Sequence, residues 1–264
     1  MTGDKKKKKK QKDEKGKSNL GISIKAILII LVLTAIPVLF YNPNLSFGPL
    51  DVARQDFFKT EILLSGNSYS TTGLVKAIRA NDMKTVKLFV RSGFDLNNIA
   101  DSGISPICIA AETGNFAVFS AMMQGDVNLV LRNFSNGLTP IYCAIKGNNI
   151  QVVDKIVKSG IGLNFRTDLV GGISPLHYAA ALGLDNMVSY LTSAGADVNI
   201  TDVNGQTPLH KAVNQDNIVV LYILLNAGAD VDLEDNYGKT ALDMAKDSKN
   251  DVYVALLKRF SKKP

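Results

Sequence analysis

The sequence predicts an all-α chain: a solenoid of helix-turn-helix units, preceded by one transmembrane helix. The first observation is a short motif that occurs five times, with its leading glycines 34, 35, 33 and 33 residues apart. The second is a glycine-containing turn that follows the motif, at Gly93, Gly195 and Gly228, and the third is an apolar stretch near the N-terminus. A fixed period of this length is typical of stacked repeats, each of which is one supersecondary unit.

Residues 1–19 form a charged, low-complexity tail in which Lys5 to Lys10 are unbroken. Such a block cannot bury apolar surface, so we expect it to be disordered. Charge alone suits it to bind anionic lipid or nucleic acid. We favour the interpretation that it sets the membrane orientation of the segment that follows.

Residues 20–41 are the predicted transmembrane signal-anchor helix. The 22 residues from Leu20 to Tyr41 contain one charge, Lys25, which lies near an end and can reach the interface. As a helix they span roughly 33 Å, enough to cross a bilayer core. A cleaved signal peptide is the alternative, but it would be shorter and end in a small-x-small site, which residues 41–46 lack.

The lysine distribution predicts how the chain lies across the membrane. Residues 1–25 hold ten lysines, whereas residues 42–61 hold only Arg54 and Lys59. Positive flanks stay in the cytoplasm, so the C-terminal part is predicted on the far side. That side is the periplasm for a bacterial inner membrane, and the lumen or the exterior for a eukaryotic cell. After residue 25 there are 20 basic and 21 acidic residues, which argues against a nucleic-acid surface on the folded part.

The remaining segments follow in order. Residues 42–50 are a predicted polar linker, and residues 51–70 a predicted N-terminal capping helix with its helical part at 51–64. Residues 71–264 form the predicted repeat domain, closed by a C-terminal capping helix at 250–259. Terminal caps are expected because the end units of a solenoid must seal its core.

The motif from Gly205 to Ala212 has a physical interpretation. Thr207 can cap a helix whose first residue is Pro208, where a missing N–H costs nothing. A second helix follows, and Gly228 is expected to end it in the left-handed conformation. The apolar residues of that second helix are Ile218, Val219, Leu221, Leu224 and Leu225.

These residues resemble the ankyrin repeat, whose signature is Gly-x-Thr-Pro-Leu-His-x-Ala-Ala. The match runs from about residue 71 to the C-terminus as about six repeats, near-consensus at 172–180 and 205–212 and degenerate elsewhere. The helix before them resembles the lead-in helix of bacterial ankyrin arrays. The resemblance implies a non-enzymatic adaptor or scaffold that binds another protein. The chain departs from the family pattern in two places. The turn signature is missing between Gly114 and Gly137, and the loop between repeats three and four (a finger, as such loops are called) is two residues longer than its neighbours, at 166–170.

The histidines and cysteines favour structural roles. His177 and His210 occupy the same repeat position, and equivalent positions on stacked helices lie about 8–10 Å apart, too far to share a metal ion. In the family this histidine bonds around its own turn. Cys108 and Cys143 lie in successive first helices, one position out of register, and are predicted to be unpaired rather than a disulfide or a nucleophile.

No motif indicates catalysis or a cofactor. There is no Gly-rich phosphate loop, paired-carboxylate site or nucleophile elbow. The recurring aspartates follow the repeat period, which is typical of turn residues. We therefore predict no enzyme activity, no cofactor and no metal site. Those aspartates are Asp197, Asp202, Asp230 and Asp235.

The resemblance implies that a protein partner docks on the concave side, formed by finger tips and first helices. Apolar and aromatic groups on such a face are typical of interaction sites. The alternative function is a cytoplasm-facing or tail-driven binder of anionic lipid or nucleic acid. The predicted protein-binding residues are Ile104, Leu138, Ile173 and Gln206 beside the signatures; Glu112, Lys146, Ala181, Leu182, Asn214 and Gln215 at the ends of first helices; and Phe134, Leu169 and Tyr178, expected to be exposed.

Overall fold

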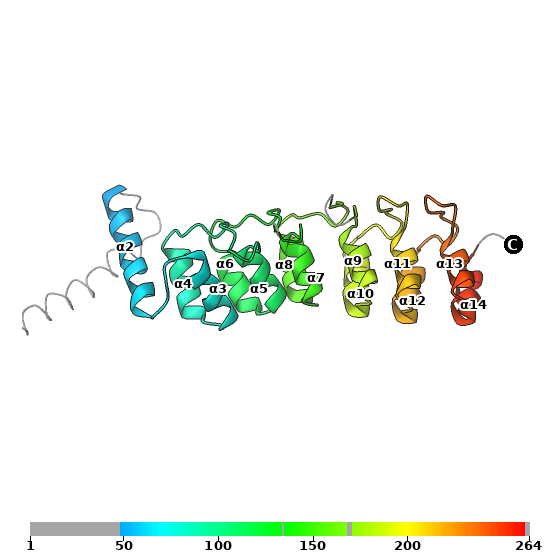
Figure 1. Ribbon diagram of the computed structural model, residues 1–264, viewed down its shortest axis with the longest axis horizontal. Helices are drawn as coiled ribbons and strands as arrows, with labels where there is room; N and C mark the ends of the chain where they lie inside the picture. The colour runs from blue at the N-terminus through cyan, green and yellow to red at the C-terminus, as the bar shows by residue number, and fades with distance from the viewer. Residues whose placement is uncertain (1–47, 134, 168–170, 262–264) are drawn as a thin grey trace, which may run out of the picture. The chain divides into compact units, whose positions relative to one another are not determined.

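A computed structural model of the chain describes residues 48–133, 135–167 and 171–261 (Figure 1). The chain divides into two compact units, Met1–Asp56 and Phe57–Pro264. The described part is helical apart from one isolated bridge between Glu234 and Thr240. The helices are α2 (Gly48–Leu64), α3 (Thr71–Arg79), α4 (Met83–Arg91), α5 (Pro106–Thr113), α6 (Phe116–Met122), α7 (Pro140–Lys146), α8 (Ile150–Lys158), α9 (Pro175–Ala181), α10 (Asp185–Ser193), α11 (Pro208–Asn214), α12 (Ile218–Asn226), α13 (Ala241–Asp247) and α14 (Asp251–Phe260).

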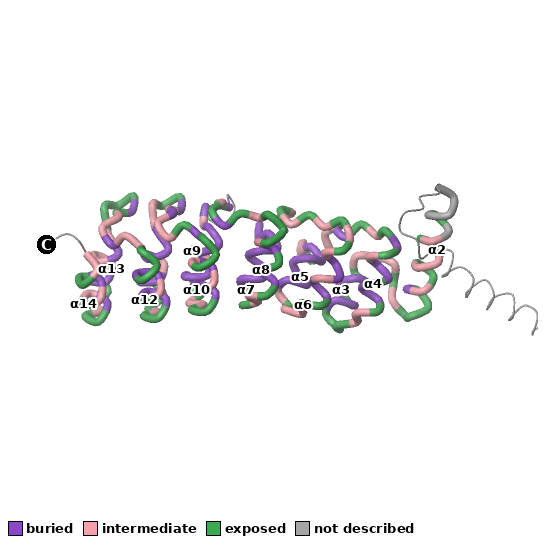
Figure 2. The backbone as a smooth tube through the Cα atoms, turned by 180° about the vertical axis from the view of Figure 1, so that it is seen from behind, coloured by how far each residue is buried: buried purple, intermediate pink, exposed green. Residues whose placement is uncertain are grey.

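The second unit is built from helix pairs. In the part of it that is described, α3 to α14 form six pairs, and the first helix of each pair packs against the first helix of the next. One continuous core follows the row, and exposed residues gather at the finger tips and helix ends (Figure 2). The predicted solenoid of helix-turn-helix units is confirmed.

The helix boundaries follow from capping. Residues Ser105, Thr139, Ser174 and Thr207 are extended N-caps, and a proline follows each of them at the first helical position. An N-cap side chain can accept a hydrogen bond from an N–H that the helix leaves unpaired, and proline has no N–H to lose there. The second helix α12 ends at Asn226, and Gly228 adopts a φ of 90°. The predicted start at Pro208 and stop at Gly228 are both confirmed.

In the four described repeats that carry this proline, the core centres on the residue after it. Ile107, Ile141, Leu176 and Leu209 are fully buried. Burying a side chain of this size stabilises the fold by roughly 1.5–3 kcal/mol. Alanines beside them let adjacent first helices approach closely.

The fingers between repeats differ in length. Each finger is closed where a glycine N–H donates to the carbonyl of an earlier residue, and the second and third of the five fingers hold more residues between these groups. The predicted insertion between repeats three and four is confirmed, and the preceding finger is also longer than the remaining three. The closing pairs are Gly103 with Ala100, Gly137 with Asn133, Gly172 with Thr167, Gly205 with Asp202, and Gly238 with Asp235.

Helix α2 begins at Gly48, three residues before the predicted start at residue 51. The predicted linker at 42–50 is therefore wrong at its C-terminal end, because Pro49 is compatible with the first turn of a helix. Within the second unit, Ile62 is buried in the core and Glu61 lies 3.9 Å from the ammonium of Lys84. The capping role of this helix stays a prediction.

The predicted tail, the predicted span at 20–41 and most of the linker lie outside the described residues. Among the helices that are described, none combines the length and apolar character needed to cross a membrane.

Candidate functional site: a protein-binding surface

The surface predicted for binding rests on a series of hydrogen bonds between repeats, which we call the carbonyl ladder. In four successive repeats of the described part, the third residue of the first helix reaches the backbone carbonyl beside the next repeat's signature. This contact fixes the backbone of each finger-to-helix corner. The contacts are Cys108 Sγ to Leu138 O at 3.9 Å, Tyr142 Oη to Ile173 O at 2.7 Å, His177 Nε2 to Gln206 O at 2.7 Å, and His210 Nε2 to Lys239 O at 3.1 Å.

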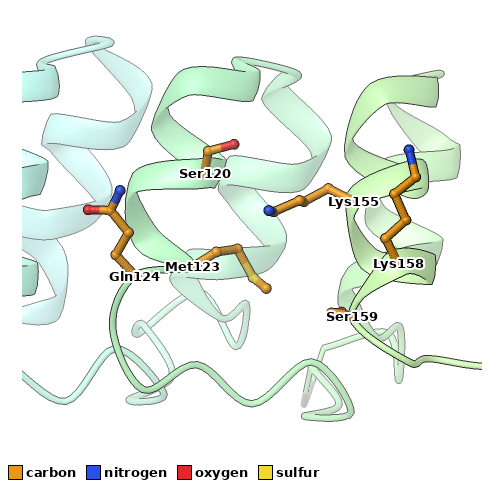
Figure 3. Close-up of a pocket in the computed structure, with 6 residues that line it drawn as sticks. All are labelled: Ser120, Met123, Gln124, Lys155, Lys158 and Ser159. Carbon is orange, nitrogen blue, oxygen red and sulfur yellow. The ribbon is translucent and has the colours of Figure 1, made fainter.

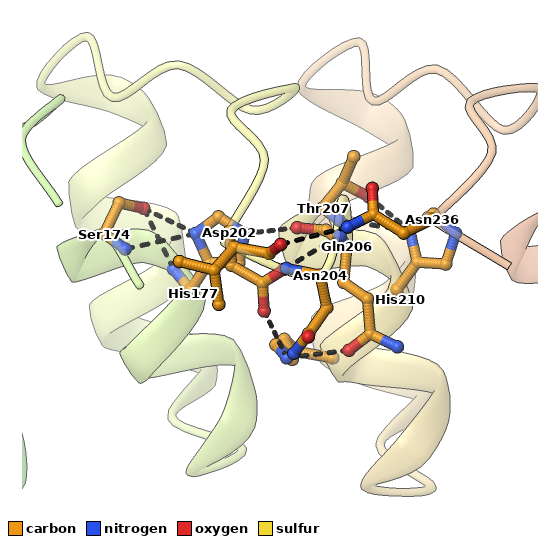
Figure 4. Close-up of polar contacts among 10 residues, drawn as sticks. Ser174, His177, Asp202, Asn204, Gln206, Thr207, His210 and Asn236 are labelled. Atoms are coloured by element: carbon orange, nitrogen blue, oxygen red, sulfur yellow. Dashed lines mark hydrogen bonds and ion pairs between the residues drawn. The ribbon is translucent and has the colours of Figure 1, made fainter. Parts of the chain in front are cut away.

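The imidazoles of the ladder have a defined proton position. His177 Nδ1 lies 3.2 Å from the Ser174 backbone N and 2.8 Å from its hydroxyl (Figure 4). Because Nε2 faces a carbonyl, which only accepts, Nε2 carries the proton and Nδ1 accepts the backbone N–H. His210 repeats this arrangement with Thr207, at 3.1 and 2.8 Å. The predicted structural role of both histidines, bonding around their own turns, is confirmed.

Burial keeps these imidazoles neutral. Desolvation lowers the pKa of His177 to about 4, and it also lowers the pKa of His210. A neutral imidazole can accept at Nδ1 and donate at Nε2 at once, whereas the charged form can only donate. Protonation would therefore break the capping bond and leave a buried charge.

A buried ion pair supports the finger between repeats four and five. The Lys211 ammonium lies 2.7 Å from Asp202 Oδ2 and 2.7 Å from Gln206 Oε1. The other Asp202 oxygen accepts the backbone N–H groups of Asn204 and Gln206 (Figure 4). Burial alone would raise the pKa of Asp202, but the ion pair with Lys211 and these N–H bonds outweigh it and lower the pKa. The Gln206 side chain is thus held in one position.

An aromatic cluster lies one repeat earlier on the same surface. The Tyr142 ring meets the rings of Phe165 and Tyr178 edge-on, with centroids 5.7 and 5.5 Å apart. Tyr142 is fully buried, whereas Tyr178 is half-buried and keeps an accessible edge. An aromatic residue held in this way offers contact area at little entropic cost, which suits an anchor for a partner.

The other predicted residues lie at the finger-to-helix corners and at the ends of the first helices. Ile104, Ile173 and Gln206 are half-buried at finger-to-helix corners. Glu112 and Lys146 form an ion pair of 2.8 Å that joins the ends of α5 and α7. At the ends of α9 and α11, Leu182 is 44% exposed, Ala181 is half-buried, and Asn214 and Gln215 are exposed. Phe134 and Leu169 lie outside the described residues.

The prediction that Leu138 faces a partner is wrong. Its side chain is only 5% exposed and belongs to the core. The contact between α5 and α7 is the most extensive of any described helix pair. Small residues on both helices, Cys108 and Ala111 on α5 and Cys143 and Ala144 on α7, allow this approach, and the corner that holds Leu138 is covered. We call the remaining described members of the prediction the recognition row: Ile104, Glu112, Lys146, Ile173, Tyr178, Ala181, Leu182, Gln206, Asn214 and Gln215.

Both cysteines are buried free thiols. The Asn133 amide donates to Cys143 Sγ at 3.5 Å, and its oxygen accepts the backbone N–H of Ser105 at 2.8 Å. The hydrogen bond with Cys108, together with burial, raises the pKa of Cys143. A protonated, buried thiol is a poor nucleophile, so the contacts of Cys143 favour a packing role for that residue.

Several residues of this surface escaped the sequence analysis. Tyr142 stands where near-consensus repeats carry histidine, and that substitution was a signal for its ladder bond. Lys211 occupies the position that Tyr178 has in the preceding repeat, one residue after the histidine. A lysine there, close to the finger that carries Asp202, could have indicated the ion pair between the two residues. Tyr237, 80% exposed on the last finger, had no signal beyond its place in a turn.

The described residues contain no group of three His, Cys, Asp or Glu side chains arranged to hold a metal ion. What they do contain is a row of different side chains on corners whose backbone is fixed. Such an arrangement can recognise the shape and hydrogen-bonding groups of a partner.

Comparison with known proteins agrees with this architecture. A family model described as ankyrin repeats (3 copies) matches residues 74–168, 123–202 and 176–263. The chain is similar to the ANK repeat-containing protein nipk-1 of Caenorhabditis elegans, with 34% identity over 83 residues that cover 31% of the chain and 13% of that protein. It is also similar to a putative ankyrin repeat protein of Rickettsia felis, with 32% identity over 98 residues, 36% of the chain and 22% of the relative.

A third relative is the putative ankyrin repeat protein FPV031 of fowlpox virus, with 36% identity over 133 residues, 49% of the chain and 38% of that protein. The chain spans well under half the length of each of these relatives. The matched family segments together reach from residue 74 to residue 263, and they coincide with the helix pairs α3 to α14. This chain therefore belongs to the ankyrin-repeat family.

Proposed function

We propose that this chain is a membrane-anchored, non-enzymatic adaptor that binds another protein through the recognition row. The observation that carries the proposal is the carbonyl ladder, which fixes the corners beneath Ile173 and Gln206 while their side chains stay partly accessible. Fixed corners reduce the entropy that binding must remove. Tyr178 and Leu182 add apolar area next to them.

The membrane part of the proposal rests on sequence. Residues 20–41 are apolar apart from Lys25, and ten lysines lie in the first 25 residues. We place the repeat domain on the non-cytoplasmic side, as a single-pass protein of a bacterial inner membrane with its repeats in the periplasm.

Topology is tested with C-terminal fusions to two reporters, one active only outside the cytoplasm and one active only inside it. An outside signal is expected, and it would limit the search for a partner to exported proteins. An inside signal would contradict the lysine argument and make cytoplasmic partners the ones to seek.

Partner binding is tested with a photo-crosslinking amino acid at Leu182 or Gln206 of the full chain in cells. The control position is Ser189, which is exposed on a second helix away from the row. Crosslinks to one protein are expected from the two row positions and not from the control. The combined Phe134→Ala, Leu169→Ala and Tyr178→Ala variant should lose them. Unchanged crosslinking in that variant would contradict the proposal.

The second candidate function is binding of anionic lipid or nucleic acid through the tail, favoured by the unbroken run from Lys5 to Lys10. It predicts that deleting these six lysines abolishes binding to vesicles that contain phosphatidylserine or to single-stranded RNA. Full binding by the chain that lacks the run would exclude this function.

A further inference from the structure

The second helices of the repeats reveal a site away from the recognition row. They start in register, so the sixth residue of each one occupies the same structural position. In five of the six described second helices this residue is uncharged and at least half-buried, whereas α8 carries an exposed lysine. The six residues are Leu88, Ala121, Lys155, Tyr190, Ile223 and Leu256.

Tyr190 shows in which direction the side chain at this position points. Its hydroxyl donates to Asp154 Oδ1 at 3.2 Å, and Asp154 is the fifth residue of the preceding second helix. The sixth residue therefore faces the fifth residue one repeat earlier. By the same register Lys155 faces Ser120 of α6, and Figure 3 shows the lysine pointing toward that helix. A charged side chain thus stands where the other repeats pack an uncharged one.

Helix α6 leaves space for this lysine. It has 7 residues, whereas α4, α8, α10 and α12 have 9 each. The glycine after α6, Gly125, stands one position earlier in the repeat than Gly93 does after α4. A side chain at this position would clash with Leu96, because a Cβ there would lie 2.6 Å from Leu96 Cδ1. The shortened helix ends beside α8, and a cavity of about 310 Å³ lies between them. It is lined by Ser120, Met123, Gln124, Lys155, Lys158 and Ser159 (Figure 3).

Two groups at this cavity have unused hydrogen-bonding capacity. Lys158 is neutralised by Asp154, at 2.7 Å, but no described residue forms an ion pair or hydrogen bond with the Lys155 ammonium. The Ser120 hydroxyl oxygen is buried and likewise has no hydrogen-bond partner in the described part. A buried hydroxyl without a partner is costly, so rotation of the Ser120 side chain toward an acceptor in the cavity would be favoured.

We propose that this cavity binds the carboxylate of a glutamate side chain in an acidic peptide segment of a partner protein. Lys155 supplies a charge-assisted donor to the carboxylate, and Ser120 supplies a neutral donor once its side chain rotates toward the cavity. Met123 offers an apolar wall for the glutamate methylenes, which aspartate would lack in part. The C-terminal ends of α6 and α8 also lie at the cavity, and the negative end of each helix dipole disfavours an anion of high charge. A glutamate side chain with a single charge therefore fits the cavity better than a free dicarboxylate does.

The site is separate from the recognition row and does not rest on the proposed function. It is tested by amide chemical shifts of the 15N-labelled full chain in a neutral detergent. The probes are a capped pentapeptide with a central glutamate, the same peptide with glutamine, and glutarate as the free carboxylate. Saturable shifts at Ser120, Gln124 and Ser159 are expected with the glutamate peptide. The glutamine peptide and glutarate should bind at least about tenfold more weakly.

The decisive variant is Lys155→Leu, which places leucine where α4 and α14 already have it and so preserves packing. It should weaken binding of the glutamate peptide by about tenfold. Lys87→Leu, which removes an exposed lysine of α4, is the matched control and should leave binding unchanged. Undiminished binding by Lys155→Leu, an equal loss in Lys87→Leu, or glutarate binding as tight as the peptide would each overturn the proposal.

Discussion

Repeats two and three, built from α5 to α8, differ in chemistry from repeats four and five, built from α9 to α12, although both pairs stack in the same way. In the later pair the ladder donors are imidazoles, which are tied to Ser174 and Thr207 at their own N-caps. In the earlier pair the donors are the thiol of Cys108 and the phenol of Tyr142. The stack therefore requires a hydrogen-bond donor toward the carbonyl of the next repeat and a well-packed core, and residues other than histidine can supply that donor.

The greatest loss of stability should come from emptying the core, and it tests whether the two regions pack in the same way. Leu209→Ala and Ile141→Ala remove fully buried side chains at the same repeat position. Each should lower the free energy of unfolding by roughly 2–5 kcal/mol, because each leaves a cavity between helices. Urea denaturation followed by circular dichroism measures both. A loss confined to one region would mean that the repeats do not share one register.

The next effect is a loss of stability at low pH that is expected only in the repeats with buried imidazoles. The folded pKa of His177, about 4, is below the ordinary value of 6.5, so its contribution to stability is present above pH 6.5 and is lost as pH falls through 4. The loss should reach roughly 3 kcal/mol. Hydrogen exchange at pH 7 and pH 4.5 should show protection falling more in α9 and α11 than in α5 and α7. Equal losses in all four helices would contradict this prediction.

A smaller effect separates the ladder donors themselves. His177→Ala removes a bond of 2.7 Å and the capping contact with Ser174, and it should cost roughly 1–3 kcal/mol. Cys108→Ala removes a contact of 3.9 Å to a weak donor and should cost less than about 1 kcal/mol. Thermal melts at pH 7 compare the two variants. Equal costs would show that the thiol serves the ladder as well as the imidazole does.

The smallest effect concerns the longer fingers. Deleting Asp168 and Leu169 restores the finger length of repeats four and five. Because closure entropy changes slowly with loop length, stability should change by less than about 1 kcal/mol. Urea denaturation measures this change, and crosslinking from Leu182 measures partner binding. A large loss of stability would show that the insertion contributes to the core.

Much of the fold could be predicted because its signals are local. The Thr207-Pro208 cap, the stop at Gly228 and the longer finger before Gly172 each depend on a few neighbouring residues. The repeat period then extended these local features to the whole domain. The start of α2 was misplaced because Pro49 is compatible with both a linker and a first helical turn.

The surface was predicted less well because exposure depends on neighbours in the next repeat. Leu138 occupies the same position as Gln206, and only the close approach of α5 and α7 buries it. The cavity at Lys155 required both a shortened α6 and a lysine one repeat later. Neither cause is visible in one repeat alone, so position in the period was insufficient to predict either result.

The carbonyl ladder also gives the array a direction. Every donor belongs to the earlier repeat and every acceptor to the later one, and in the last described repeat Asp243 bonds to Thr240 and Lys246 of its own repeat. Truncation from the C-terminal end would expose the imidazole N–H of His210, whereas truncation from the N-terminal end would expose a backbone carbonyl. The two cut ends therefore present opposite groups to water, a hydrogen-bond donor at the C-terminal side and an acceptor at the N-terminal side.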